Sequence, residues 1–91
     1  DMKTLRILAD NLVDIQPNLV AVLVGVVQDQ SAVLVKLGGE VEDELDASTI
    51  LKRLIHHTGG RGGGRRDMAQ GGNLDVTRCD TAFEDVRVLL T

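Results

Sequence analysis

Aromatic residues and cysteines are nearly absent from this chain. Phe83 is the single aromatic residue among 91, and Cys79 is the single cysteine. The core must therefore be built from Leu, Val and Ile, and the aromatic platforms on which many RNA-binding modules stack bases are excluded. With one cysteine the chain forms no intrachain disulfide, which is compatible with a reducing compartment.

Long apolar runs and a positive net charge are also lacking. The longest apolar run, residues 19–27, is interrupted by Gly25, and no run approaches the ~20 residues of a membrane-spanning helix. No signal peptide is recognisable, and we expect no membrane partner. The formal net charge is −4, whereas a free-standing nucleic-acid binder is usually basic.

The charges that are present are unevenly distributed. Residues 40–46 carry five carboxylates, whereas Arg61, Arg65 and Arg66 form a basic stretch that only Asp67 offsets. This distribution favours a small, directed contact through the basic stretch over a broad electrostatic footprint. The acidic stretch is interpreted as a solvated connection, because it lacks the alternating ligands and the glycine of a calcium loop.

Length and hydrophobic patterning predict one domain that starts with a helix. With 43% hydrophobic residues the chain is globular. Apolar residues at steps of three and four mark a helix over residues 1–15, which Pro17 ends; they are Met2, Leu5, Leu8, Leu12 and Ile15. Because the chain starts at Asp1 rather than at a methionine, we expect this helix to continue from an upstream helical segment. Residues 16–91 then form the globular domain.

The following segments predict a hairpin and a second helix. Residues 19–27 are a β-branched run that predicts a strand buried on both faces, and residues 31–37 predict a second strand after the polar break at residues 28–30. Either Asp46 or Ser48 can cap the next helix, which ends at Gly59 or Gly60. Its expected buried face comprises Ile50, Leu51, Leu54 and Ile55.

A last helical stripe completes the pattern. It contains Val76, Cys79, Phe83, Val86 and Leu90. Asp75 gives an early start to this helix, while Thr81 with Glu84 gives a later one. The sequence therefore predicts an α+β fold, in which about three helices cover a small β-sheet that includes a hairpin and carries a glycine-rich loop.

Residues 59–72 form that glycine-rich loop. Seven of these fourteen residues are glycine, so neither a regular helix nor an ordinary strand is expected throughout, although Met68–Gln70 can pair briefly with the sheet. Exposed backbone N–H groups and flanking arginines suit phosphate oxygens. The alternatives are a flexible loop, or glycines required only for close packing of a helix on the sheet.

This loop matches no familiar nucleotide-binding motif, but it resembles one protein family. Neither the P-loop nor the dinucleotide pattern can be placed on it. It resembles the C-terminal (C-Ala, DHH-associated) domain of alanyl-tRNA synthetases, whose signature reads Gly-Gly-Lys/Arg-Gly-Gly-Gly-Arg-Pro-Asp-Met-Ala-Gln. The matching positions are Gly59, Gly60, Arg61, Gly62, Gly63, Gly64, Arg65, Asp67, Met68, Ala69 and Gln70. The resemblance covers essentially the whole chain.

Two positions depart from the family pattern. Arg66 stands where the family usually has proline, which makes the loop more basic and less rigid. Gly71-Gly72-Asn73 stands where Ala-Gly-Gly or Gly-Gly-Gly is common. The second change is mild, because asparagine tolerates left-handed backbone angles.

The resemblance implies a non-catalytic domain that binds tRNA-Ala. In this family the domain meets the outer corner of the tRNA and helps to couple aminoacylation with editing, and it can assist homodimer formation. The implied tRNA-binding residues are Arg61, Gly62, Gly63, Gly64, Arg65, Arg66 and Gln70. The fragment would need no cofactor, whereas ATP, Mg and Zn would serve other domains of a parent ligase. The implied location is the cytoplasm, with an organelle not excluded.

Two alternative functions remain compatible with the sequence. The substrate-binding domain of a DHH-family phosphoesterase usually carries histidine where Arg65 stands here. A dimerisation module would suit the negative net charge and the apolar stripe of the first helix. No catalytic residue or metal ligand is predicted: His56 and His57 compensate a helix dipole, and Cys79 belongs to the core.

Overall fold

The structure, a computed structural model, describes residues 2–28 and 30–90. Its elements are α1 (Met2–Ile15), β1 (Val20–Val27), β2 (Gln30–Leu37), α2 (Ala47–Thr58), β3 (Arg61–Gly64), β4 (Met68–Gly72), a 3-10 turn η1 (Val76–Arg78) and α3 (Cys79–Leu90). The predicted α+β class is confirmed. Asp29, at the centre of the predicted polar break, lies outside the described residues.

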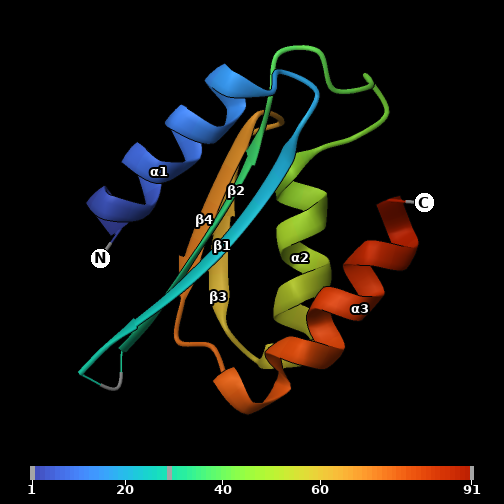
Figure 1. Cartoon of the computed structure of the whole chain (residues 1–91). Helices are drawn as coiled ribbons and strands as arrows, with labels where there is room; N and C mark the ends of the chain where they lie inside the picture. Colours follow the sequence, from blue (N-terminus) through green and yellow to red (C-terminus); the bar gives the residue numbers. More distant parts are fainter. Residues whose placement is uncertain (1, 29, 91) are drawn as a thin grey trace.

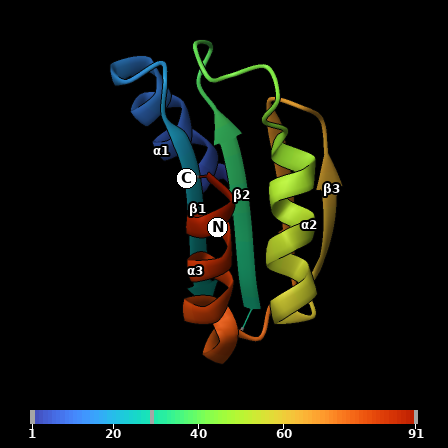
Figure 2. The same ribbon diagram turned by 90° about the vertical axis from the view of Figure 1, so that its right-hand side faces the viewer.

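The four strands form one antiparallel sheet between two layers of helix. The strand order is β1-β2-β4-β3, so β1 and β3 are the edges. Helix α1 packs on β1 and β2 from one side, while α2 covers β2, β3 and β4 from the other and α3 packs against α2 (Figure 1). Figure 2 shows α2 lying along the sheet with β3 at its outer edge. The edge strand β3 is therefore covered by a helix on one face only.

The strand register divides the core between the two faces. Val33 and Val35 of β2 are fully buried on the α2 side, where they join a cluster with Ile50, Leu51 and Leu54 of α2. Leu34, between them, points to the other face and packs against Leu5 and Ala9 of α1. This alternation is the period of two expected for a strand with both faces buried.

The apolar stripe of α1 differs from the predicted one. The buried residues are Leu5, Ala9 and Val13, whose spacing of four follows one face of the helix, and Ala9 allows close approach to the sheet. Leu8 and Ile15, both predicted to be buried, are 46% and 78% exposed. The strand over residues 20–27 is mostly half-buried rather than buried on both faces, because it lies at a sheet edge.

The ends of α2 agree with the sequence. Asp46 is the N-cap, and its carboxylate accepts from the backbone N–H groups of Ser48 (2.8 Å) and Thr49 (3.2 Å). Gly59 ends the helix with a φ of 74°, the left-handed conformation that favours glycine. Of the four residues predicted to face the core, three are buried and Ile55 is partly buried.

The last segment takes the earlier of its two predicted starts. Asp75 caps η1, which continues directly into α3. The buried residues are Ala82 and Val86, while Val76 and Phe83, predicted to be buried, are 45% and 37% exposed. Alanine contributes too little to a hydrophobic stripe to be recognised from the pattern. The side chain of Leu90 lies outside what the structure describes.

The glycine-rich loop is the main correction to the predicted fold. Most of it is a β-hairpin: Arg61–Gly64 forms β3 and pairs in register with residues 69–72 of β4. Only residues 65–67 form the turn, which Arg65 N–H closes on the Met68 carbonyl (2.8 Å). Glycine disfavours strands in general, but here β3 approaches β4 so closely that Gly62 and Gly64 leave no room for a Cβ atom. Asn73 adopts the expected left-handed conformation, with a φ of 58°.

Candidate nucleic-acid interface

The register of the β3–β4 hairpin places its arginines on the side of the sheet that α1 occupies. Arg61 pairs with Gly72 and Gly63 with Gln70, and paired residues of an antiparallel ladder point to the same face. Gln70 in turn pairs with Leu34, which packs under α1. The hydrogen bond from Arg65 N–H to the Met68 carbonyl adds the pair Arg65–Met68 to this ladder, so Arg65 lies on the same face.

The glycines of β3 have two different environments. A Cβ atom on Gly62 would lie 2.5 Å from the Gln70 carbonyl oxygen, and one on Gly64 would lie 2.4 Å from the Cα atom of Ala69. A Cβ atom on Gly63 would meet nothing within 4 Å. Gly62 and Gly64 are therefore required for the close approach of the two strands, whereas Gly63 leaves an open surface on the α1 side.

This open surface is exposed to solvent. Every residue of β3 and of the turn, from Arg61 to Asp67, is exposed. Helix α1 covers β1 and β2 on this side, and β3 has a neighbouring strand on one side only. The structure thus brings Arg61, Gly63 and Arg65 together in one line along an edge strand. Gly62 and Gly64 are part of the same strand but point to the α2 side.

Gln70, also predicted to bind RNA, makes an intramolecular contact instead of standing free. Its Oε1 atom accepts hydrogen bonds from Nε (3.2 Å) and Nη2 of Arg6 in α1. Gln70 is partly buried and Arg6 is exposed. The sequence pattern did not identify Arg6, because it lies 64 residues from Gln70 and belongs to no motif.

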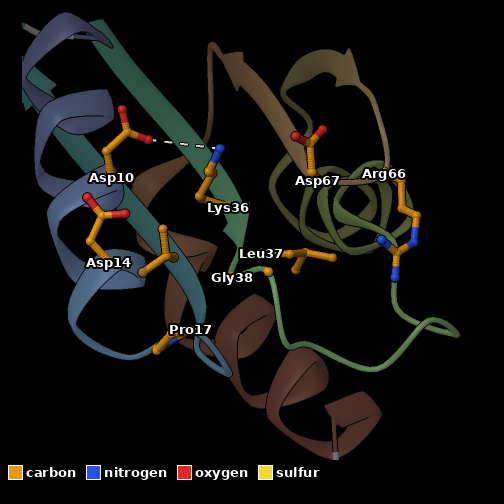
Figure 3. Close-up of a pocket in the computed structure, with 10 residues that line it drawn as sticks. Asp10, Asp14, Pro17, Lys36, Leu37, Gly38, Arg66 and Asp67 are labelled. Carbon is orange, nitrogen blue, oxygen red and sulfur yellow. Dashed lines mark ion pairs between the residues drawn. The ribbon is translucent and has the colours of Figure 1, made fainter.

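Arg66 is directed away from this surface. Its Nη2 atom lies 3.3 Å from both the Glu42 carbonyl oxygen and a carboxylate oxygen of Asp43, and its backbone carbonyl accepts from Ala47 N–H. Figure 3 shows its guanidinium pointing towards the connection between β2 and α2. The structure therefore separates Arg66 from Arg61 and Arg65 and ties it to the acidic connection.

An open pocket of about 640 Å³ lies between the end of α1, the end of β2 and the turn of the hairpin (Figure 3). Lys36 lies 3.9 Å from Asp10 across it. Asp14 and Asp67 add two further carboxylates to its wall. Because both of its cations, Lys36 and Arg66, already face carboxylates, this pocket does not favour anions.

A second group of cations lies on the opposite side of the molecule, between α2 and α3. Arg53 binds the Asp85 carboxylate through two hydrogen bonds (2.9 and 2.8 Å), and His57 Nε2 lies 3.0 Å from the same group. The hydrogen bonds from Arg53, and then from His57, lower the pKa of Asp85 to about 2. The pair His56–His57, predicted to compensate a dipole, thus contributes His57 to a bridge between two helices.

The single cysteine and the possible metal ligands were the remaining candidates for chemistry in the described part of the chain. Cys79 is partly buried, and burial, followed by the charges of Asp80 and Asp75, raises the pKa of its thiol. A raised thiol pKa opposes a role as nucleophile. Among residues 2–28 and 30–90, no three His, Cys, Asp or Glu side chains come close enough to hold a metal ion. Nor does any helix in these ranges have the length and apolar character needed to cross a membrane.

The chain matches a known domain family and several known proteins. A family model described as the DHHA1 domain matches residues 1–90. The chain is 41% identical over 84 residues, 91% of its length, to an alanine–tRNA ligase of Clostridioides difficile (strain 630). It is 35% identical over 86 residues, 94% of its length, to an alanine–tRNA ligase of Fusobacterium nucleatum subsp. nucleatum. The matched segment spans 10% of the length of each ligase.

A solved structure shares the whole fold. The crystal structure of the C-Ala domain from Aquifex aeolicus alanyl-tRNA synthetase matches with a TM-score of 0.88 at 26% sequence identity. The match covers 99% of this chain and 81% of that one. The arrangement of sheet, hairpin and helices described above is therefore that of a C-Ala domain.

Proposed function

The chain belongs to the DHHA1 domain family, as the resemblance of residues 59–70 predicted, and on that premise we propose that it is the tRNA-binding domain of an alanyl-tRNA synthetase. The ligand is tRNA-Ala, and the contact is made by the open side of the β3–β4 hairpin. Two relatives named alanine–tRNA ligases and a C-Ala domain of the same fold support the assignment.

One observation carries the proposal: Arg61 and Arg65 flank Gly63 on an exposed edge strand. Four residues of extended chain separate these arginines by ~13 Å, so that each reaches a different phosphate. Gly63 has no neighbour within 4 Å of an added Cβ, and the nucleic-acid backbone can approach the strand there. Arginine is suited to phosphate because its planar guanidinium donates two parallel hydrogen bonds.

The near-absence of aromatic residues restricts the kind of RNA surface that this domain can bind. With one aromatic residue in the chain, base stacking contributes little, and an exposed cationic strand suits a folded RNA backbone better than splayed single-stranded bases. This agrees with a contact at the outer corner of tRNA, where the backbone of the D and T loops is folded. The net charge of −4 limits the contact to this one basic strip.

Charge reversal in the hairpin tests the proposal. We expect Arg65→Glu and Arg61→Glu each to weaken the binding of tRNA-Ala at least tenfold, measured by fluorescence anisotropy, because each replaces an attraction to phosphate by a repulsion. Arg87→Glu is the matched control, since Arg87 lies on α3 and is paired with Glu84. Equal affinities for all three variants and the unaltered chain would refute the proposal.

Arg66 requires a separate variant. Because it is engaged with Asp43 and the Glu42 carbonyl, Arg66→Ala should weaken tRNA binding less than Arg65→Ala. A larger effect of Arg66→Ala would show that the arginine leaves the acidic connection to meet the RNA.

The proposal extends to the parent protein. The domain would hold the tRNA corner while other domains aminoacylate and edit the same tRNA, in a cytoplasmic ligase that uses ATP, Mg and Zn outside this segment. The chain spans 10% of the length of its ligase relatives, so we assign the catalytic steps to the rest of the parent protein. The fragment alone should therefore show no alanine-dependent pyrophosphate exchange, and measurable exchange would contradict this division of roles.

Homodimer formation is a second proposed function, which the surface of α1 favours. Ile7, Leu8 and Ile15 are 55%, 46% and 78% exposed, and exposed apolar side chains on one helix are typical of contact surfaces. Light scattering across a concentration series tests it. A mass that stays monomeric at every concentration would leave only the tRNA-binding proposal.

A further inference from the structure

The arginines of this chain divide into two groups by their partners. Four of the seven form ion pairs with carboxylates: Arg53 with Asp85, Arg66 with Asp43, Arg78 with Asp75 and Arg87 with Glu84. Within the described ranges 2–28 and 30–90, no carboxylate pairs with the other three, which are Arg6, Arg61 and Arg65. These three all lie on the α1 side of the β3–β4 hairpin.

The partner of Arg6 is a neutral amide and not a carboxylate. Its Nε and Nη2 atoms both donate to the amide oxygen of Gln70, which fixes the guanidinium without cancelling its charge. Gln70 is the cross-strand partner of Gly63, so the guanidinium held by Gln70 lies on the face of the sheet to which Gly63 opens. Helix α1, on this side of the sheet in Figure 1, thereby forms one wall of the surface.

We infer that Arg6 is a third phosphate-binding residue of this surface, and that Gln70 acts as the residue that positions Arg6 rather than as an RNA contact itself. The inference rests on the proposed tRNA-binding function and adds α1 to the interface. Three arginines then share this face of the sheet: Arg61 and Arg65 along the edge strand, and Arg6 of α1, which is bonded to Gln70 of the neighbouring strand. Gln70, which the motif alone would assign to the RNA, is occupied by the helix.

The test compares single and double variants of the 91-residue chain in salt titrations with a tRNA-Ala transcript. We expect Arg6→Ala to weaken binding roughly three- to tenfold and to lower the slope of log K against log[salt] by about one, since each phosphate contact contributes ~0.7–0.9 to that slope. Arg87→Ala removes the same charge from α3 and should change neither quantity by more than the general charge effect.

A double-mutant cycle distinguishes a positioning role of Gln70 from a direct contact with the RNA. Gln70→Ala should weaken binding about twofold in the unaltered chain and should have no effect in the Arg6→Ala background, because a positioning residue acts only through its partner. Gln70→Glu should weaken binding as much as Arg6→Ala, because a carboxylate there neutralises Arg6. Loss of affinity by Gln70→Ala in the Arg6→Ala background would overturn the positioning role.

The outcomes distinguish this inference from the proposed function. If Arg65→Glu abolishes binding while Arg6→Ala behaves like Arg87→Ala, the tRNA contact stands and the role of Arg6 is wrong. If none of the variants changes binding, the proposed function itself fails. Melting temperatures within a few degrees of the unaltered chain establish that Arg6→Ala and Gln70→Ala remain folded, and Arg6→Lys, which keeps the charge but loses the two-pronged bond, should retain part of the affinity.

Discussion

A Cβ atom on Gly64 would lie 2.4 Å from the Cα atom of Ala69, across the two strands of the β3–β4 hairpin. Real Cβ atoms do not approach backbone atoms so closely, and a backbone atom cannot rotate away as the end of a flexible side chain can. Gly64 is therefore required for the packing of β3 against β4, apart from any role in binding. The packing role and the proposed binding role belong to different residues, because Gly63 faces open space.

This difference predicts opposite results for two neighbouring substitutions. Gly64→Ala should destabilise the chain by about 1–3 kcal/mol, the usual range for an overpacked site, which lowers the melting temperature by roughly 4–8 °C per kcal/mol in a domain of this size. Gly63→Ala should leave the melting temperature unchanged or slightly higher, because an alanine that fits reduces the freedom of the unfolded chain. Thermal melts followed by circular dichroism measure both, and equal melting temperatures for the two variants would contradict the assignment.

The sequence predicted the helices and the first hairpin well, for identifiable reasons. Pro17 and Gly59 end helices by backbone geometry alone, and apolar runs on either side of a polar break identify β1 and β2. The sequence did not predict β3, because glycine carries no strand signal and the close approach of Gly64 to Ala69 becomes visible only when the strands are paired. The stripe of α1 was misread for a related reason: Ala9 is fully buried yet adds little to a hydrophobic pattern.

The cap of α2 provides a second prediction. Asp46 accepts hydrogen bonds from Ser48 and Thr49 N–H, so Asp46→Ala should lower the free energy of unfolding by about 1 kcal/mol, within the usual range of 0.5–2. Glu44→Ala removes the same charge from the same acidic connection without touching the cap. Urea denaturation of both variants makes the comparison, and a loss in Glu44→Ala as large as that in Asp46→Ala would rule out the cap as the cause.

The bridge between α2 and α3 makes stability depend on pH in the acid range. The pKa of Asp85 is lowered from 3.8 to about 2 by its hydrogen bonds to Arg53 and His57. A carboxyl whose pKa is lowered on folding stabilises the fold above its unfolded pKa, and that stabilisation is lost as the pH falls through the folded value. The melting temperature of the unaltered chain should therefore exceed that of Asp85→Asn above about pH 4, and the gap should close towards pH 2. A gap that stays constant over this range would contradict the role of the Asp85 charge.

The candidate site was predicted in part. Arg61 and Arg65 were identified from the motif, and the structure places them on one exposed face. Arg66 was identified with them, but it follows Arg65 directly, and adjacent residues at the end of a strand point to different sides. Its guanidinium pairs with Asp43 instead. Arg6 was not identified, because its contact with Gln70 depends on the packing of α1 on the sheet, which no local pattern encodes.

The central claim, that the open side of the β3–β4 hairpin binds the folded corner of tRNA, is tested most directly by a salt titration of the unaltered chain with tRNA-Ala. A tRNA with a disrupted D-loop/T-loop corner and a single-stranded DNA of similar length serve as competitors. The account predicts that intact tRNA binds best, with a salt slope that corresponds to about two or three phosphate contacts. Equal binding of the disrupted tRNA or of the DNA, or no binding at all, would contradict it.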